Sequence, residues 1–419
     1  MLLPPPIFLD RTTMNLSKAE YRRVLLAACL LLMLSIGYRS GFGLFLQPLS
    51  SARGWGRDVL SLALATQNLA WGVVAVFAGA LADRFGNLKV IVAGVVLYAA
   101  GMWGMSVAET EWQIILTAGF LVGAGIAGTS FGIVLPAIVR AVPEDKRSWA
   151  LGVGTAAGSF GQFLIVPLMQ GLIEAFGMYP SLKILAASAF VMALLAIPLA
   201  PFSGSREVKP SAGGPSVAEP SLWSTLISAL KVRSYTLLVF GFFVCGFHIA
   251  FITVHMPSYL LDLGFEAKVG AWSISLIGLF NVFGAYIAGV QSGKRPKHLI
   301  LAGIYLARVV AISAFVLIPV SLTSILMFSA AMGFLWLATV PPTSGLVVTF
   351  FGTRYMAFLY GFVFLSHQLG SFSGVWLGGY LYEHYGNYDG IWYLGIVLGL
   401  VAAALHWPIQ ERPAKLALA

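Results

Sequence analysis

Five ionisable side chains lie inside long apolar stretches of this chain. Arg39 and Arg308 are permanent cations, and His248, His255 and His367 can take up a proton near neutral pH. An Arg at the centre of a membrane span costs about 2.5–3.5 kcal/mol on insertion scales, so each deep charge needs a reason. All 16 carboxylates lie in loops or at the ends of the apolar stretches. Deep cations without an acid favour binding of a small anion over binding of a lipophilic cation or a sugar.

Polar and aromatic side chains in the same stretches extend this candidate site. We expect a substrate to contact residues from several stretches, namely Arg39, Tyr38, His248, Asn281, Arg308, Trp336, His367 and Gln368. The side chain expected to carry a coupled proton is His248, with His367 as the second choice and His255 as a further candidate. Structural alternatives stay open: Arg39 could snorkel towards lipid or brace a helix, His248 could bond to a neighbouring helix, and Arg308 could tie its helix to the eighth or eleventh.

The composition predicts a membrane protein. Of the 419 residues, 59% are hydrophobic and 10% are charged, whereas about a quarter are charged in a soluble domain. The net charge of +9 comes from residues between the apolar stretches, which indicates membrane topology rather than nucleic-acid binding. Cys29 and Cys245 both lie in apolar stretches, so neither a disulfide framework nor a metal site is expected.

The apolar stretches are long enough to cross a bilayer, which takes about 20 mostly apolar residues. Prolines at Pro341-Pro342 in the tenth stretch predict either a bend for gating or a packing kink. The sequence therefore predicts an all-α membrane protein with twelve spans, near 24–49, 58–81, 88–108, 112–139, 149–173, 181–201, 235–261, 270–291, 299–319, 323–350, 355–382 and 390–408.

The basic residues predict how the chain is oriented. If the N-terminus is inside, most of the 25 Lys and Arg residues fall in inner segments, and the outer loops hold only Arg53, Arg57 and Lys268. We expect both termini in the cytoplasm, a monomer, and a location in a bacterial inner membrane. Met1 and Met14 are both open as the start. The expected units are 1–22, a half at 23–201, a polar linker at 202–233, a half at 234–410 and a tail at 411–419.

The chain also partly repeats itself. A shift of 209 or 210 positions overlays like residues, including Gly37 on Gly246, Gly79 on Gly289, Gly123 on Gly333, Gly177 on Gly386, and Tyr179 on Tyr388. A nearly constant offset across several helix pairs predicts two parallel repeats of six helices.

One loop carries a recognisable motif, Gly79-Ala80-Leu81-Ala82-Asp83-Arg84-Phe85-Gly86-Asn87-Leu88-Lys89. It resembles the G-x-L-x-D-R-x-G-x-x-K signature of the major facilitator superfamily. Glycines allow a sharp turn, and an Asp at the start of the third helix would meet the positive end of its dipole. The resemblance implies twelve transmembrane helices in two six-helix pseudo-symmetric halves, the major facilitator fold. It assigns conformational gating to Gly79, Asp83, Arg84, Gly86 and Arg140.

The resemblance also implies a central cavity lined by the first and seventh helices. The repeat pairs Arg39 with His248, so we expect these two side chains to face each other there. Within the superfamily the chain looks most similar to the monocarboxylate and oxalate/formate carriers, because Arg39-Ser40 is followed by Leu44-Phe45. Monocarboxylate carriers often have an Asp and an Arg where this chain has Asn281 and Ala285. Arg39 or Arg308 would then have to bind a carboxylate.

We therefore expect a secondary transporter that moves a small organic anion, such as a monocarboxylate, by alternating access, with protons as the candidate coupling ion. An organic-anion exchanger or an efflux carrier for another small solute stays open, and so does a transporter-like membrane sensor. The sequence has no nucleotide-binding P-loop, metal-ligand cluster or nucleophile–base spacing, so we expect neither an enzyme nor a cofactor. The expected partners are the small anion, protons and the lipid bilayer, with no nucleic acid.

Overall fold

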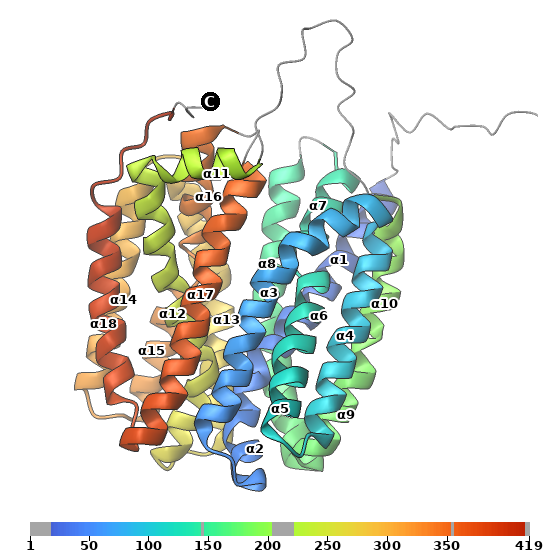
Figure 1. Ribbon diagram of the computed structural model, residues 1–419, viewed down its shortest axis with the longest axis vertical. Helices are drawn as coiled ribbons and strands as arrows, with labels where there is room; N and C mark the ends of the chain where they lie inside the picture. Colours follow the sequence, from blue (N-terminus) through green and yellow to red (C-terminus); the bar gives the residue numbers. More distant parts are fainter. Residues whose placement is uncertain (1–17, 144–145, 203–221, 353–355, 415–419) are drawn as a thin grey trace, which may run out of the picture.

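The computed structural model describes residues 18–143, 146–202, 222–352 and 356–414, and the regular elements in these ranges are all helical (Figure 1). The first half contains α1 (Lys18–Gly41), η2 (Phe42–Phe45), α2 (Leu46–Arg53), α3 (Arg57–Phe85), α4 (Asn87–Val107), α5 (Glu111–Ile114), η3 (Ile115–Leu121), α6 (Val122–Thr129), α7 (Phe131–Ala141), α8 (Arg147–Phe176), α9 (Met178–Ala189), α10 (Val191–Ala196) and η5 (Ile197–Phe202). The second half contains α12 (Arg233–Asp262), α13 (Ala267–Ser292), α14 (Lys297–Leu317), α15 (Leu322–Leu335), α16 (Val340–Phe351), α17 (Met356–Tyr385) and α18 (Asp389–His406).

These elements make twelve membrane crossings. Eleven of them are long and apolar enough to span a bilayer, from Ala19–Arg53 to Asp389–His406. The twelfth is α17, whose 30 residues exceed the roughly 20 that a span requires. The expected fold class is confirmed: the protein is an all-α membrane protein of twelve transmembrane helices in two six-helix halves. A short helix, α11 (Leu222–Leu230), lies in the segment that the sequence analysis assigned to the polar linker.

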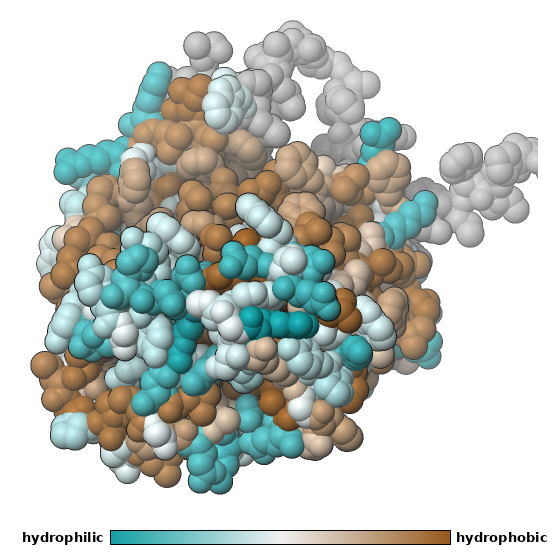
Figure 2. Space-filling view, turned by 60° about the horizontal axis from the view of Figure 1, so that its bottom comes forward, coloured by the Kyte–Doolittle hydropathy of each residue, from teal (hydrophilic) through white to brown (hydrophobic). Residues whose placement is uncertain are grey.

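The helix ends gather at two opposite faces (Figure 1). The terminal face holds the start of α1 and the end of α18, and it lies at the top of Figure 1. The Arg57 face, at the bottom, holds α2 and the start of α3. Figure 2 turns the Arg57 face towards the viewer, and hydrophilic side chains gather over its middle with hydrophobic side chains around them. This pattern fits a face in water bordered by lipid.

The two halves repeat each other in their packing as well as in their sequence. Ser35 Oγ and Thr129 Oγ1 lie 2.8 Å apart, and Cys245 Sγ and Thr339 Oγ1 lie 3.2 Å apart. Adding 210 to the numbers of the first pair gives the second. Both threonines lie where a crossing breaks, at the end of α6 and just before α16. The fourth and tenth crossings are therefore broken and pinned at equivalent points.

Glycine contacts follow the same offset. A Cβ on Gly123 would press on the carbonyl of Gln67, and a Cβ on Gly333 would press on the carbonyl of Ile277. Small residues at these positions let two helix backbones approach closely, which drives helix packing in a membrane. The structure thus supports the sequence pairing of Gly123 with Gly333.

The two halves meet most closely near the Arg57 face. A Cβ on Gly379 of α17 would collide with Ser61 of α3. A Cβ on Gly43 of η2 would lie 2.5 Å from the carbonyl oxygen of Thr253 and 3.0 Å from the Cα atom of Val254, both in α12. Neither contact leaves room for one more carbon atom, so the interface is closed at this end.

The same interface opens towards the terminal face. At mid-height, a Cβ on Gly72 of α3 would lie 2.9 Å from the Cβ atom of Gln368 of α17. Gly79 and Gly361 lie two helical turns closer to the terminal face, on the same sides of α3 and α17. A Cβ at either position would have no heavy atom within 4 Å. The halves therefore diverge from the Arg57 face towards the terminal face.

Candidate functional site

Arg39 lies between α1 and α3 near the middle of the molecule. Its Nη2 donates to Asn68 Oδ1 at 2.7 Å, and its guanidinium carbon lies 4.9 Å from the centre of the Trp71 ring. Its Nε is buried without a hydrogen-bond partner, and no described carboxylate lies within 4.0 Å of its guanidinium nitrogens. The side chain is partly exposed. A cation with unused donors and no acid beside it is suited to an anionic ligand.

Trp71 is held in place from two directions. Its Nε1 donates to Ser130 Oγ at 3.1 Å, at the break between α6 and α7. Its ring meets the ring of Phe364 from α17 edge to face, with centroids 5.5 Å apart. The aromatic side chain next to Arg39 is therefore fixed by the broken fourth crossing on one side and by the second half on the other.

Two amides connect Arg39 with His367 across the two halves. Gln368 Nε2 donates to the carbonyl oxygen of Asn68 at 3.0 Å, and Gln368 Oε1 lies 3.0 Å from His367 Nδ1. An amide oxygen only accepts, so Nδ1 is the nitrogen of His367 that carries hydrogen in this arrangement. The imidazole stacks on the ring of Phe364, with an angle of 9° between the planes. The structure thus brings Arg39, Gln368 and His367 into one group.

A second polar group crosses the boundary through α8. Asn281 Nδ2 donates to Ser159 Oγ at 2.8 Å, and Asn281 Oδ1 accepts from the backbone nitrogen of Leu337 at 2.9 Å. One turn along α8, Gln162 Nε2 donates to the carbonyl oxygen of Ile274 at 2.8 Å. Asn281 therefore joins the first half to the broken backbone of the tenth crossing, next to Trp336.

Tyr38 and His248 lie away from this centre. Tyr38 Oη lies 2.9 Å from Ser188 Oγ on α9, and His248 Nε2 lies 2.8 Å from the carbonyl oxygen of Gly395 on α18. The sixth and twelfth crossings are equivalent in the repeat, so packing pairs Tyr38 with His248. The expectation that His248 faces Arg39 is wrong, because the offset of the seventh crossing here is 210 rather than 209.

Arg308 is a tie within the second half. It is fully buried in α14, and its Nη2 donates to the carbonyl oxygens of Leu335, at 2.8 Å, and of Trp336. It also lies 3.6 Å from Cys245 Sγ. Carbonyls at the end of α15 lack intrahelical partners, and a cation there is favoured by the helix dipole. Arg308 therefore ties α14 to α12 and to the break of the tenth crossing, rather than to the eighth or eleventh helix that the sequence analysis considered. A contact of Arg308 with the substrate stays a prediction.

His255 lies closer to the Arg57 face, and both of its ring nitrogens have partners. Nδ1 lies 3.1 Å from Tyr388 Oη, and Nε2 lies 2.9 Å from the carbonyl oxygen of Val375. The ring is completely buried. His255 thus joins α12 to α17 and to the start of α18, at a distance along α12 from the group around Arg39.

Comparison with known proteins identifies the class of protein that carries this arrangement. The sequence profile of the Major Facilitator Superfamily matches residues 28–375. The chain belongs to this superfamily. Its members are membrane transporters, so the protein is a multi-pass transporter of the membrane and is not an enzyme.

Relatives span most of the chain at low identity. The uncharacterized MFS-type transporter YcxA of Bacillus subtilis is 24% identical over 83% of this chain and 84% of its own length. Monocarboxylate transporter 13 of Rattus norvegicus is 25% identical over 74% of this chain and 70% of its own length. A solved structure of a bacterial homologue of the human lysosomal transporter Spinster, inward-facing and unoccupied, covers 93% of this chain and 97% of its own, with a TM-score of 0.75 and 14% identity.

The superfamily loop motif lies at the terminal face. Gly86 has a φ of 95°, which a residue with a side chain rarely adopts, so glycine is required at this turn. Asp83 lies in the last turn of α3, because α3 runs to Phe85, so the expectation that Asp83 begins the third helix is wrong. Its side chain lies outside the described residues. Arg84 packs over the ring of Phe85, with 5.2 Å between the guanidinium carbon and the ring centre.

The fourth crossing ends at the same face with Arg140, whose Nη1 donates to the carbonyl oxygen of Phe202 at 3.1 Å. This contact lies within the first half. The gating roles assigned to Gly79, Asp83, Arg84, Gly86 and Arg140 stay predictions.

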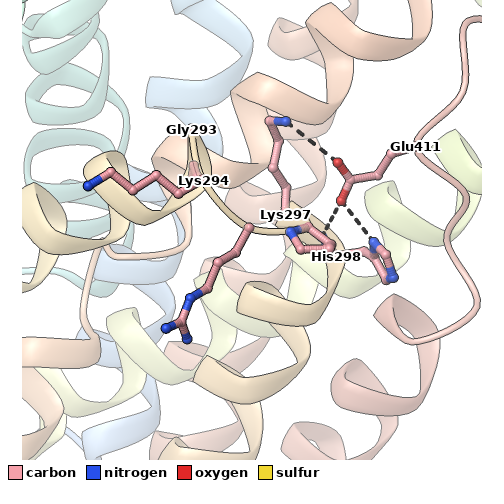
Figure 3. A pocket seen from close by; sticks show the side chains of 8 residues that line it. Gly293, Lys294, Lys297, His298 and Glu411 are labelled. Carbon is pink, nitrogen blue, oxygen red and sulfur yellow. Dashed lines mark hydrogen bonds and ion pairs between the residues drawn. The ribbon is translucent and has the colours of Figure 1, made fainter.

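A pocket of about 420 Å³ also lies at the terminal face of this superfamily member (Figure 3). Glu411 from the tail lies 3.5 Å from Lys297 Nζ and 2.8 Å from His298 Nδ1, and it accepts from the backbone nitrogen of His298 at 3.0 Å. Burial opposes ionisation of the Glu411 carboxyl, but the hydrogen bonds from His298 and the charge of Lys297 hold its pKa below the ordinary value. The carboxylate caps the start of α14 and fastens the tail there.

The sequence analysis missed several residues of the central group. It weighed ionisable side chains, whereas the structure adds the neutral Asn68, Trp71, Ser159, Gln162 and Phe364. A polar pair such as Gln67-Asn68 inside an apolar span was the available signal, because neutral polar side chains in a span also need partners.

Proposed function

We propose that this superfamily member transports a small monocarboxylate. The observation that carries the proposal is the environment of Arg39: one nitrogen bound to Asn68, a buried Nε without a partner, and no described carboxylate nearby. One guanidinium balances one negative charge. A dicarboxylate would bring a second negative charge that Arg39 alone does not balance, and an unpaired charge inside a protein is costly. Similarity to monocarboxylate transporter 13 supports the same substrate class.

We further propose that the terminal face lies in the cytoplasm, with the protein in a bacterial inner membrane. The basic residues support this orientation, because most of the described ones lie at the terminal face, in loops or at helix ends, whereas Arg53, Arg57 and Lys268 lie at the Arg57 face. In this orientation the described conformation opens inwards, and the substrate would leave Arg39 towards the cytoplasm.

His367 is the group that we propose for proton coupling. It is linked to Arg39 through Gln368 and Asn68, whereas His248 points to α18 and His255 is bonded at both nitrogens. An anion bound to Arg39 would offset the positive charge that acts on the His367 imidazole across Asn68 and Gln368. Binding of the anion and binding of the proton would then favour each other.

Uptake into proteoliposomes tests the substrate class. The purified protein is reconstituted and offered labelled short monocarboxylates, a dicarboxylate, a neutral sugar and an organic cation, with and without a pH gradient. We expect accumulation of a monocarboxylate, faster when the outside is acidic, and no uptake of the sugar or the cation. Uptake of the sugar or the cation with no uptake of any monocarboxylate would overturn the proposal.

A further inference from the structure

Arg57, the first residue of α3, is held by the opposite half of the protein. Its Nη1 and Nη2 donate to the two carboxylate oxygens of Asp262, at 2.5 and 2.6 Å. Nη1 also donates to Tyr388 Oη at 3.2 Å, and the guanidinium carbon lies 3.8 Å from the centre of the Tyr382 ring. Only 10% of the Arg57 side chain and 24% of the Asp262 side chain are exposed. A bidentate pair fixes the geometry of both groups, and removal of one partner from a largely buried pair leaves the other charge uncompensated.

Each charge in this pair lies at the end of its helix where the helix dipole disfavours it. Arg57 is a cation at the positive end of the α3 dipole, and Asp262 is an anion at the negative end of the α12 dipole. Neither charge is favoured by its own helix. Together the two charges compensate each other, so each half gains from contact with the other at this point.

The start of α3 depends on the second half in another way. Gly56 provides no side-chain cap, and the backbone nitrogen of Arg57 instead donates to Glu383 Oε2 of α17 at 3.0 Å. Free backbone N–H groups at a helix start need an acceptor. Separation of the halves would therefore cost α3 its cap as well as its ion pair.

Tyr388, which accepts from Arg57, is itself fixed by residues closer to the middle of the protein. Tyr388 Oη is 3.1 Å from His255 Nδ1, and His255 Nε2 is 2.9 Å from the carbonyl oxygen of Val375. A carbonyl only accepts, so Nε2 carries hydrogen and Nδ1 accepts from the tyrosine hydroxyl. The tyrosine oxygen then accepts from Arg57. This chain of contacts holds α12, α17 and α18 together on the side of the ion pair that faces the middle of the protein.

We propose that Arg57 is the latch of the Arg57 face: its contacts with Asp262, Glu383, Tyr382 and Tyr388 hold this face closed while the terminal face is open. Opening of the Arg57 face in the transport cycle requires these contacts to break. The proposal depends on alternating access and does not depend on which solute is carried or on how the protein is oriented in the membrane.

Two introduced cysteines show whether each end of the interface is open. They are introduced into a protein in which Cys29 and Cys245 are replaced by Ser. Ser61→Cys lies in the closed part, where the serine is completely buried against Gly379. Gly361→Cys lies in the open part, where a Cβ has no neighbour within 4 Å. The rate of maleimide labelling of purified protein in detergent measures how often each end is open, and it needs no substrate.

The latch variants are Asp262→Asn and Arg57→Gln, and the matched control is Arg53→Ala. Arg53 lies at the same face and packs on Tyr179 within the first half, at 5.2 Å between the guanidinium carbon and the ring centre. A third variant, Gly43→Ala, places a carbon against Thr253 and Val254 and opposes closure without touching the ion pair.

With either latch variant, we expect labelling of Ser61→Cys to become about tenfold faster and labelling of Gly361→Cys to become slower, as a two-state equilibrium shifts. Gly43→Ala should act in the same direction, and Arg53→Ala should change neither rate. Unfolding would raise both rates, so opposite changes distinguish a released latch from damage. Two results would overturn the proposal. In the first, both cysteines are labelled at the same rates in the two latch variants as in Arg53→Ala. In the second, both cysteines are labelled faster in the latch variants, whereas in Gly43→Ala the two rates change in opposite directions.

Discussion

Asn68 and Gln368 join the two halves of the protein at mid-height, through a hydrogen bond of 3.0 Å from the Gln368 side chain to the Asn68 carbonyl oxygen. The side chain of the same asparagine accepts from Arg39 at 2.7 Å. A ligand that competes for Arg39 would therefore disturb a residue that also touches α17. In this way the central cation is coupled to the boundary along which the halves must move.

The Arg39 side chain is the first test of the proposed site. Arg39→Ala should weaken monocarboxylate binding roughly tenfold to a hundredfold, because a hydrogen bond to a charged group contributes about 1.5–3 kcal/mol. Arg39→Lys should retain part of the affinity, since Lys keeps the charge but lacks the planar fork. Equilibrium binding to purified protein measures both, with Arg53→Ala as the control. Unchanged affinity in Arg39→Ala would place the substrate elsewhere.

Proton coupling is tested at His367. His367→Gln should abolish most accumulation driven by a pH gradient while exchange of substrate for substrate continues, because exchange needs no net proton movement. His248→Gln is the matched control, as His248 contacts α18 instead. Paired uptake and exchange assays in the same proteoliposomes give the comparison. Equal losses in both assays, or a larger effect at His248, would speak against His367.

Asp83→Asn tests the gating motif. We expect slower transport with substrate affinity nearly unchanged, because Asp83 lies in the last turn of α3 at the terminal face and far along that helix from Asn68. Initial uptake rates and equilibrium binding should be measured on the same preparation. A large loss of affinity would show that the motif acts on the binding site itself.

Arg308→Ala separates a structural tie from a ligand role. The variant leaves the carbonyls of Leu335 and Trp336 without a donor inside the protein. We expect the melting temperature to fall by several degrees, at about 2–4 °C per kcal/mol for a large domain, with substrate affinity unchanged in the folded fraction. Arg308→Lys should recover part of the loss. Weakened binding with an unchanged melting temperature would instead favour contact with the substrate.

The tail contact predicts a dependence on acid. The pKa of Glu411 is lower when it is bound to His298 and Lys297, so this stabilisation is fully present above the ordinary carboxyl pKa, about 4.5, and is lost as the pH falls through the lower pKa of the bound form. A spin label at Ala414→Cys should be immobile at pH 7 and become mobile as the pH falls through the pKa of the bound form. Adding Glu411→Gln should make it mobile across the whole titration. A label that stays equally immobile throughout an acid titration without Glu411→Gln would contradict this.

Hydropathy, basic residues and the repeat were sufficient to predict the crossings and the two halves. They could not set the rotation of each helix, because a shift of one residue turns a side chain by about 100°. Arg39 and His248 show the effect, because an offset of 209 pairs them. Packing instead pairs Tyr38 with His248, whose side chains point away from the central group and contact α9 and α18.

The latch was missed for a related reason. Arg57 and Asp262 stand 205 positions apart at the ends of different helices, and in the sequence each looks like an ordinary charge at a membrane surface. Their pairing depends on how two halves dock, which no local pattern contains. Pro341 and Pro342 predicted a break in the tenth crossing. The sequence analysis found no similar signal for the break at Ser130 in the fourth crossing.

The contact of Gly43 with the backbone of Thr253 and Val254 also limits where water can enter between the halves. It leaves no space for a methyl group and none for a water molecule, which is about as large. Protons can cross a membrane along an unbroken file of water molecules. At this point of the interface, the described conformation leaves no passage for such a file.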